Sequence, residues 1–186
     1  MDKLVIDQGD RPHLPEVQAA IDDLRQGSKR SWQYKAAVSG SFRRHLSEVQ
    51  AAMDELDRHR VRVLSPGGTV ALGEERGFTF LATDPSLDIK ETEDSHLGAI
   101  AKSDFLWVVC PDGQAGDSTL FEIAAAYAWD KPIFCLHELY DTCDGLTDAR
   151  NLVTQVIDIP AALTLVERQR DELRKRLTLL PGFRIS

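Results

Sequence analysis

The hydrophobic residues of the chain follow two patterns: short continuous runs, and longer stretches with helical spacing. Continuous apolar runs are typical of strands that are covered on both faces of a sheet, and spacings of three and four residues indicate amphipathic helices. The runs predict strands at residues 34–39, 61–64, 78–81, 105–110, 132–136 and 155–159. The spacings predict helices at residues 14–26, 45–58, 91–102, 118–129 and 161–179.

This alternation of strands and helices predicts an α/β fold, in which a parallel sheet of about five strands is covered by helices on both faces. Most of the stretch 67–90 is predicted to be loop, with its short strand as an extra element. The predicted parts are an N-terminal helical extension at 1–30, an α/β domain at 31–160 and a C-terminal helix at 161–186. Ligands of such folds bind beyond the carboxyl ends of the strands. Candidate chemistry is therefore expected in the loops at 40–45, 65–75 and 111–118.

The charge balance narrows the classes of partner. The 186 residues include 22 Lys and Arg against 30 Asp and Glu, a formal net charge of −8. A nucleic-acid polymer or an anionic membrane needs a basic face, so we expect neither as a partner. No apolar run approaches the roughly 18 residues of a membrane span, and the first residues lack the apolar core of a secretory leader.

The cysteines and histidines refine this picture. The three cysteines have no paired spacing, which is typical of free thiols in a reducing cytoplasm. Cys110 and Cys135 lie in apolar runs and are predicted to be buried packing residues, as is Trp107. The five histidines show no metal-ligand spacing, so we expect no bound zinc.

The first candidate segment, Gly40-Ser41-Phe42-Arg43-Arg44, follows the first predicted strand and precedes a helix. A glycine there allows a ligand to approach the backbone closely, and free amides at a helix start attract anions. Either arginine could hold a phosphate through paired donors. The alternative is an ordinary strand-to-helix turn with solvated arginines, since short glycine motifs are common.

The second candidate segment, residues 111–122, joins the most apolar strand to the next helix. Thr119 and Glu122 have the spacing of a capping box, in which the glutamate would bond back to the backbone at the helix start. In the functional interpretation, Glu122 lies in the first helical turn, where the positive helix end keeps a carboxylate ionised. An ionised carboxylate suits nucleophilic attack, so another group must then serve the leaving group. The titratable candidates nearby are Asp94, His96, Asp112 and Asp117.

Three segments together resemble the nucleoside 2-deoxyribosyltransferase family and its nucleotide N-hydrolase relatives. They are AVSGSFR at 37–43, HLGAIAKSDFLWVV at 96–109 and DGQAGDSTLFEIAAAYAWDKPIF at 112–134. The last segment is the most specific, because strand, glycine-containing loop, Ser-Thr, Glu-Ile and small-residue helix occur together and in order. The resemblance spans residues 34–136 and implies a flavodoxin-like Rossmannoid three-layer fold.

The resemblance also implies an activity. Family members cleave the N-glycosidic bond with a glutamate that attacks the sugar C1′, and the matching residue here is Glu122. A second base or water then resolves the glycosyl-enzyme ester. The family implies homo-oligomers, with sites often completed by a neighbouring subunit, and neither a metal nor an organic cofactor.

Two positions depart from the family pattern. His96 stands where the transferases have an aspartate, and Gly116 stands where they have a carboxylate. Asp117 is adjacent to that glycine, and Ser118 is the closest match to the phosphate-binding serine of the N-hydrolases.

The leading hypothesis is therefore cleavage or transfer at the N-glycosidic bond of a nucleoside or nucleoside 5′-monophosphate. Its expected catalytic residues are Glu122 as nucleophile and His96 as the group that handles the base, assisted by Asp94 or Asp112. The expected substrate-binding residues are Gly40, Ser41, Phe42, Arg43, Asp112, Gly116, Asp117, Ser118 and Thr119. The alternative hypothesis is a non-catalytic nucleotide-binding or sensor module on the same fold, which the histidine at the aspartate position favours.

Overall fold

The computed structural model describes residues 31–140 and 149–178, so the helix predicted at 14–26 and Cys143 lie outside the described residues. The strands are β1 (Tyr34–Gly40), β2 (Val61–Ser65), β3 (Ala71–Glu75), β4 (Phe78–Leu81), β5 (Phe105–Val109), β6 (Ile133–Cys135) and β7 (Gln155–Val156). The helices are α2 (Phe42–Arg58), α3 (Ile89–Lys102), α4 (Asp117–Ala128), α5 (Ala149–Leu152) and α6 (Ile159–Thr178).

Five strands form one parallel sheet in the order β2-β1-β5-β6-β7. When these five strands are numbered 1 to 5 along the chain, their order in the sheet is 2-1-3-4-5, which is that of flavodoxin-like folds. In this order the direction in which strands are added to the sheet reverses between the first and the third strand. Those strands are β1 and β5 here, and all five residues of β5 are buried. The predicted α/β fold with an all-parallel sheet and a three-layer architecture is therefore confirmed.

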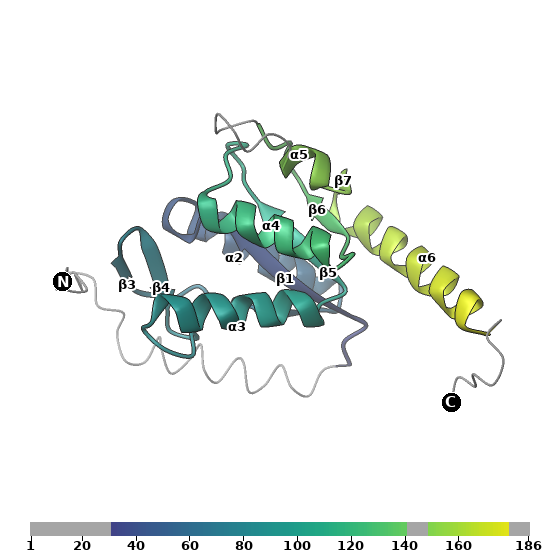
Figure 1. The fold of residues 1–186 in the computed structure, drawn as a ribbon, viewed down its shortest axis with the longest axis horizontal. Coiled ribbons are helices and arrows are strands. Elements are labelled where there is room, and N and C mark those ends of the chain that lie inside the picture. Colours follow the sequence, from purple (N-terminus) through teal and green to yellow (C-terminus); the bar gives the residue numbers. More distant parts are fainter. Residues whose placement is uncertain (1–30, 141–148, 179–186) are drawn as a thin grey trace.

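Helices cover both faces of the sheet, as Figure 1 shows. On one face, α2 and the start of α6 pack on alternate residues of β1 and β5, with Val49 and Val166 fully or almost fully buried. On the other face, α3 and α4 pack through Ile100 and Ile123. Adjacent residues of a strand point to opposite faces, which explains why continuous apolar runs in the sequence became the central strands.

The cysteines and the tryptophan singled out from the sequence lie in this core. Cys110, Cys135 and Trp107 are buried, as predicted. Burial raises the pKa of Cys110 to about 12 and that of Cys135 to about 11, so both thiols stay protonated at neutral pH. Reactive cysteines need an accessible thiolate, so these two serve packing.

A β-hairpin made of β3 and β4 stands beside the start of α3 (Figure 1). The sequence predicted β4 but assigned the rest of this stretch to loop, and that assignment was wrong for β3. Arg76 and Gly77 turn the hairpin with φ values of 51° and 80°. A two-residue turn with two positive φ values matches the right-handed twist of the flanking strands.

The terminal helix belongs to the same core as the sheet. It begins at Ile159, two residues before its predicted start, and its first turns bury Ala162 and Val166. Farther along, the hydroxyl of Tyr34 donates a hydrogen bond to Glu167, and the Arg170 guanidinium lies over the Tyr34 ring.

Within the described part of the chain, no helix combines the length and apolar character that a membrane crossing requires.

Candidate functional site

A cavity of about 460 Å³ opens beyond the carboxyl ends of β1 and β2, between the hairpin, α3 and the start of α4. Most of the site residues predicted from the sequence line it: Gly40, Ser41, Phe42, Arg43, His96, Gly116, Asp117, Ser118, Thr119 and Glu122. Asp94 and Asp112 are not among the lining residues. The loops expected to carry chemistry thus meet at one place, although they are distant in sequence.

Gly40 explains how β1 and β5 can close so tightly at the edge of this cavity. A Cβ atom added to Gly40 would lie 2.5 Å from the carbonyl oxygen of Val109. The two strand ends therefore approach more closely than any residue with a side chain would permit. Helix α2 follows at once, with Phe42 as its first residue.

Glu122 is placed by α4, but not as a capping residue. The helix is capped by Gly116 without a side-chain hydrogen bond, so the capping-box interpretation is wrong. Glu122 is the sixth residue of the helix, in its second turn, whereas the helix dipole acts mainly within the first turn. Its carboxylate instead accepts a hydrogen bond from the hydroxyl of Ser39 on β1.

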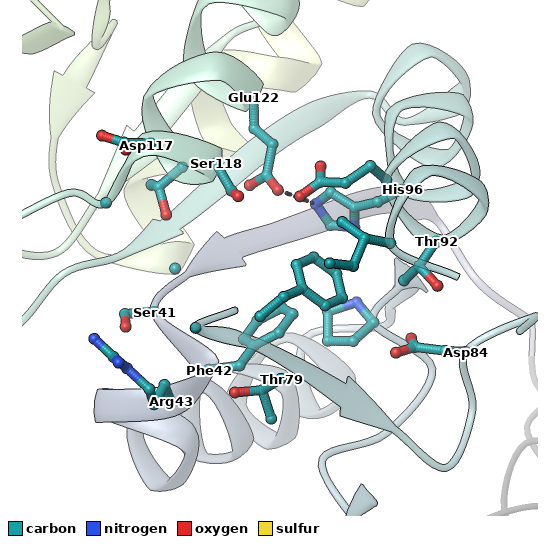
Figure 2. A pocket seen from close by; sticks show the side chains of 18 of the residues that line it. Ser41, Phe42, Arg43, Thr79, Asp84, Thr92, His96, Asp117, Ser118 and Glu122 are labelled. Carbon is teal, nitrogen blue, oxygen red and sulfur yellow. Dashed lines mark ion pairs between the residues drawn. The ribbon is translucent and has the colours of Figure 1, made fainter. Parts of the chain in front are cut away.

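His96 faces Glu122 from α3, and Figure 2 shows the two side chains pointing toward one another. Nε2 of the imidazole lies 3.5 Å from Oε1 of Glu122, and Nδ1 lies 2.6 Å from the hydroxyl oxygen of Ser65. Burial by itself lowers the pKa of His96, but the carboxylates of Glu122, Glu93 and Asp84 together raise it above its ordinary value. The site therefore favours an imidazolium beside a carboxylate.

Glu93 also lines the cavity, and sequence reasoning missed it. Its Oε2 is buried without a hydrogen-bond partner among the described residues. Burial and the nearby charge of Glu122 raise the pKa of Glu93, and the Ser118 hydroxyl and His96 oppose this rise without cancelling it. Its spacing could have revealed it, because residues three apart on a helix share a face and Glu93 is three residues before His96.

Asp94, chosen from the sequence, lies on a different side of α3. It is paired with Lys90 one turn earlier, and its side chain is 60% exposed. Residues two apart on a helix do not face the same way, so Asp94 and His96 could not both enter the cavity. The structure therefore does not bring Asp94 to the site.

Asp112 braces the loop after β5 against α2. Its Oδ2 lies 3.2 Å from Nη1 of Arg44 and 3.1 Å from Nε2 of His45. Slight burial raises the pKa of Asp112, but the Gln114 amide, His45 and Arg44 outweigh it, and the pKa falls below its usual value. Asp112 thus lies outside the lining of the cavity and neutralises Arg44, which does line it.

Two arginines mark the opposite, cationic end of the cavity. Arg43 and Arg76 both line it, and neither side chain forms an ion pair or hydrogen bond with a described residue. Nη1 of Arg43 lies 3.9 Å from the Cβ position that a side chain at Gly77 would occupy, so the first turn of α2 reaches the hairpin turn. Figure 2 shows the Arg43 side chain at the far side of the cavity from His96.

These groups give the cavity two chemically distinct ends. One end holds a carboxylate, an imidazole and a second carboxylate. The other presents two guanidinium groups without a side-chain partner in the described part of the chain, together with the start of α2 and the start of α4, where Asp117 lies. Phe42 and Phe78 add apolar surface to the lining of the cavity. Within residues 31–140 and 149–178, no three His, Cys, Asp or Glu side chains are grouped so as to hold a metal ion.

Comparison with known proteins adds no family to this picture. A scan against protein-family models found no match, and a search of curated proteins found none either. The geometry of the cavity is therefore the basis of the functional argument.

Proposed function

We propose that this protein cleaves the N-glycosidic bond of a nucleoside or a nucleoside 5′-monophosphate, with Glu122 as the nucleophile. The observation that supports it is a carboxylate held from two sides, by Ser39 and His96, at the wall of an open cavity. Its volume of about 460 Å³ falls within the roughly 300–1,000 Å³ of small-molecule sites. A pentose and its base can enter a space of this size.

The proposed reaction follows the two-step route of a carboxylate nucleophile. Glu122 attacks C1′ while the bond to the base breaks, which gives a glycosyl-enzyme ester and the free base. Water or a second base then attacks C1′ and restores the Glu122 carboxylate. Ser39 and His96 restrict the rotation of the Glu122 side chain, so its oxygen is already oriented when the substrate binds.

The cationic end supports the choice of a phosphorylated sugar. Arg43 and Arg76 carry charges that no described carboxylate neutralises, in a chain of net charge −8. Guanidinium groups bind phosphate oxygens through paired donors, and the backbone amides at the starts of α2 and α4 favour an anion as well. We infer that a 5′-phosphate lies at this end, with the sugar between it and Glu122.

The direct experiment incubates the full chain with a panel of nucleosides and their 5′-monophosphates and measures free base, with and without an acceptor base. Wild type should release base from at least one of them, and Glu122→Gln should lose that activity. Glu172→Gln, an exposed change on α6, is the matched control and should retain it. If wild type and Glu122→Gln give the same background with every substrate, the proposed reaction is wrong.

A second candidate function is a nucleotide-binding or sensor module without catalysis. The ion pair of Glu122 with His96, at the position where transferases have an aspartate, favours it. If the protein only binds nucleotides, monophosphates should raise its thermal unfolding midpoint without any release of free base. If stabilisation is accompanied by release of free base, the enzyme hypothesis is supported over the binding module.

We also propose a homo-oligomer. Helix α4, which carries Glu122, exposes 57% of Phe121 and 59% of Tyr127. Large apolar side chains on the outer face of one helix are typical of a contact with another chain. Sedimentation velocity over a range of concentrations tests this, with Phe121→Ser expected to shift the protein toward the monomer.

A further inference from the structure

The departing base needs a proton donor, and His96 is poorly placed to be that donor. Its Nδ1 lies 2.6 Å from the Ser65 hydroxyl. Its Nε2 has no hydrogen bond to a described residue, but it lies 3.5 Å from Oε1 of Glu122 and so points at the nucleophile. His96 therefore acts as a positioning residue for Glu122, and the proton must come from another group.

We propose that Glu93 is the general acid that protonates the leaving base, an inference that rests on the function proposed above. Glu93 lies one helical turn before His96 on α3 and lines the same cavity as Glu122. It is a carboxyl group on the neighbouring helix, so the nucleophile and the acid come from two separate elements. A pair of carboxyl groups with different environments is the usual arrangement for splitting a glycosidic bond.

The surroundings of Glu93 favour its protonated form before the reaction. One carboxyl oxygen, Oε2, is buried and has no hydrogen-bond partner among the described residues, and a charge on such an oxygen is poorly compensated. The groups that face it are Glu122 and Ser118 from α4 and His96 from its own helix. The Glu122 charge opposes a second negative charge in the cavity.

The first step balances without any further reagent. Glu122 forms a bond to C1′ as the bond from C1′ to the base nitrogen breaks, and the electron pair of that bond passes to the base. The Glu93 carboxyl proton moves to the base, which leaves as a neutral molecule, and Glu93 becomes a carboxylate.

The second step reverses the role of Glu93. Once Glu122 is an ester it carries no charge, so the repulsion that favoured protonated Glu93 is gone. Glu93 then accepts a proton from the attacking water as the oxygen of that water bonds to C1′ and the ester bond breaks. Glu122 returns as a carboxylate, Glu93 returns protonated, and the sugar leaves with a hydroxyl at C1′.

The test compares leaving groups that do and do not need a proton. With wild type, Glu93→Gln and Asp94→Asn, kcat/KM is measured for a substrate that wild type cleaves and for an activated partner of the same sugar. For a purine substrate, the activated partner is the same nucleoside or nucleotide methylated at N7 of the base. For a pyrimidine substrate, it is the p-nitrophenyl glycoside of the same sugar, from which p-nitrophenolate departs. Asp94→Asn is the matched control, because it removes a carboxylate from the next position of the same helix, outside the cavity.

We expect Glu93→Gln to lower kcat/KM for the natural substrate by about 10²- to 10⁴-fold, the usual contribution of a general acid. For the activated partner the loss should stay below about tenfold, because that base departs without a proton. Glu93→Asp keeps a proton to give and should retain more activity on the natural substrate than Glu93→Gln does. Asp94→Asn should match wild type on both.

Each other result overturns the inference. Equal losses on both leaving groups would mean that Glu93 only supports the structure or binds the sugar, and a loss below about tenfold on the natural substrate would mean that another group donates the proton. An inactive wild type would instead refute the proposed function, and Glu93 would have no reaction to serve. Circular dichroism of each variant shows whether it is folded.

Discussion

Nε2 of His96 lies 3.5 Å from Oε1 of Glu122, so an imidazole from α3 and a carboxylate from α4 meet at the wall of one cavity. Neither helix contributes a useful site alone. The pair exists because the parallel sheet brings both helices to the same face and aligns their inner surfaces. The ionisation of His96 therefore depends on the charge of Glu122.

Replacing Glu122 should change the titration of His96. The carboxylates around His96 raise its pKa above the ordinary 6.5, and after burial, which lowers it, Glu122 has the largest effect. In Glu122→Gln the burial remains while that charge is lost, so the pKa of His96 should fall. NMR titration of the imidazole protons measures this directly.

The same pair makes stability depend on pH. A folded-state pKa above the unfolded value means that His96 protonation contributes stability, fully present below about 6.5 and lost as the pH rises through the folded value. The free energy of unfolding, measured with urea, should therefore fall more steeply over that pH range for wild type than for Glu122→Gln. Parallel curves for the two proteins would show that the ion pair has no energetic effect.

The ionisation of Glu93 should also affect the stability of the fold. Its pKa is raised in the fold, so its protonation contributes stability below the ordinary 4.5 that is lost as the pH rises through the folded value. Glu93→Gln is neutral in both the folded and the unfolded chain, so folding requires neither a buried charge nor the uptake of a proton, and its unfolding midpoint at neutral pH should exceed that of wild type. Such a gain in stability with a loss of activity is typical of functional sites. A lower midpoint for Glu93→Gln would contradict this account.

Much of this arrangement could be predicted from the sequence, because it depends on patterns that are local. The apolar run that became β5 had to be covered on both faces, and the helix that follows had to start near residue 117. Parallel strands then place their following loops at one edge, which is why the predicted segments at Gly40 and Ser118 line the same cavity.

The failures have separate physical reasons, and in one of them a partner distant in the chain decides the outcome. Thr119 and Glu122 have the spacing of a capping box, yet Ser39, 83 residues away, supplies the hydrogen bond that Glu122 accepts. The hairpin went unpredicted at β3 because its turn uses Arg76 before Gly77, where Asn or Asp is the usual signal. Asp94 was a different error, since helical spacing alone already favoured Glu93.

Arg43 and Arg76, whose side chains have no partner among the described residues, should determine the preference for a phosphorylated substrate. Arg43→Ala and Arg76→Ala should each weaken binding of a nucleoside 5′-monophosphate by about tenfold, the loss of one charge-assisted contact. Binding of the corresponding nucleoside should change little, because it carries no phosphate. Arg58→Ala, at the exposed end of α2, is the matched control. Isothermal titration with both ligands separates the cases, and equal losses for nucleoside and monophosphate would place the phosphate elsewhere.

Two glycines at the cavity edge should differ in how strongly they respond to the same substitution. In Gly40→Ala the new Cβ meets the Val109 carbonyl at 2.5 Å, and because that oxygen belongs to the backbone, β1 and β5 must separate. We expect a loss of about 1–3 kcal/mol in the free energy of unfolding, as for other overpacked positions. In Gly116→Ala the Cβ meets nothing within 4 Å, and the φ of −78° suits any residue. That variant should stay within about 1 kcal/mol of wild type in urea unfolding, so similar losses at both positions would show that the tight closure of β1 on β5 does not shape this edge.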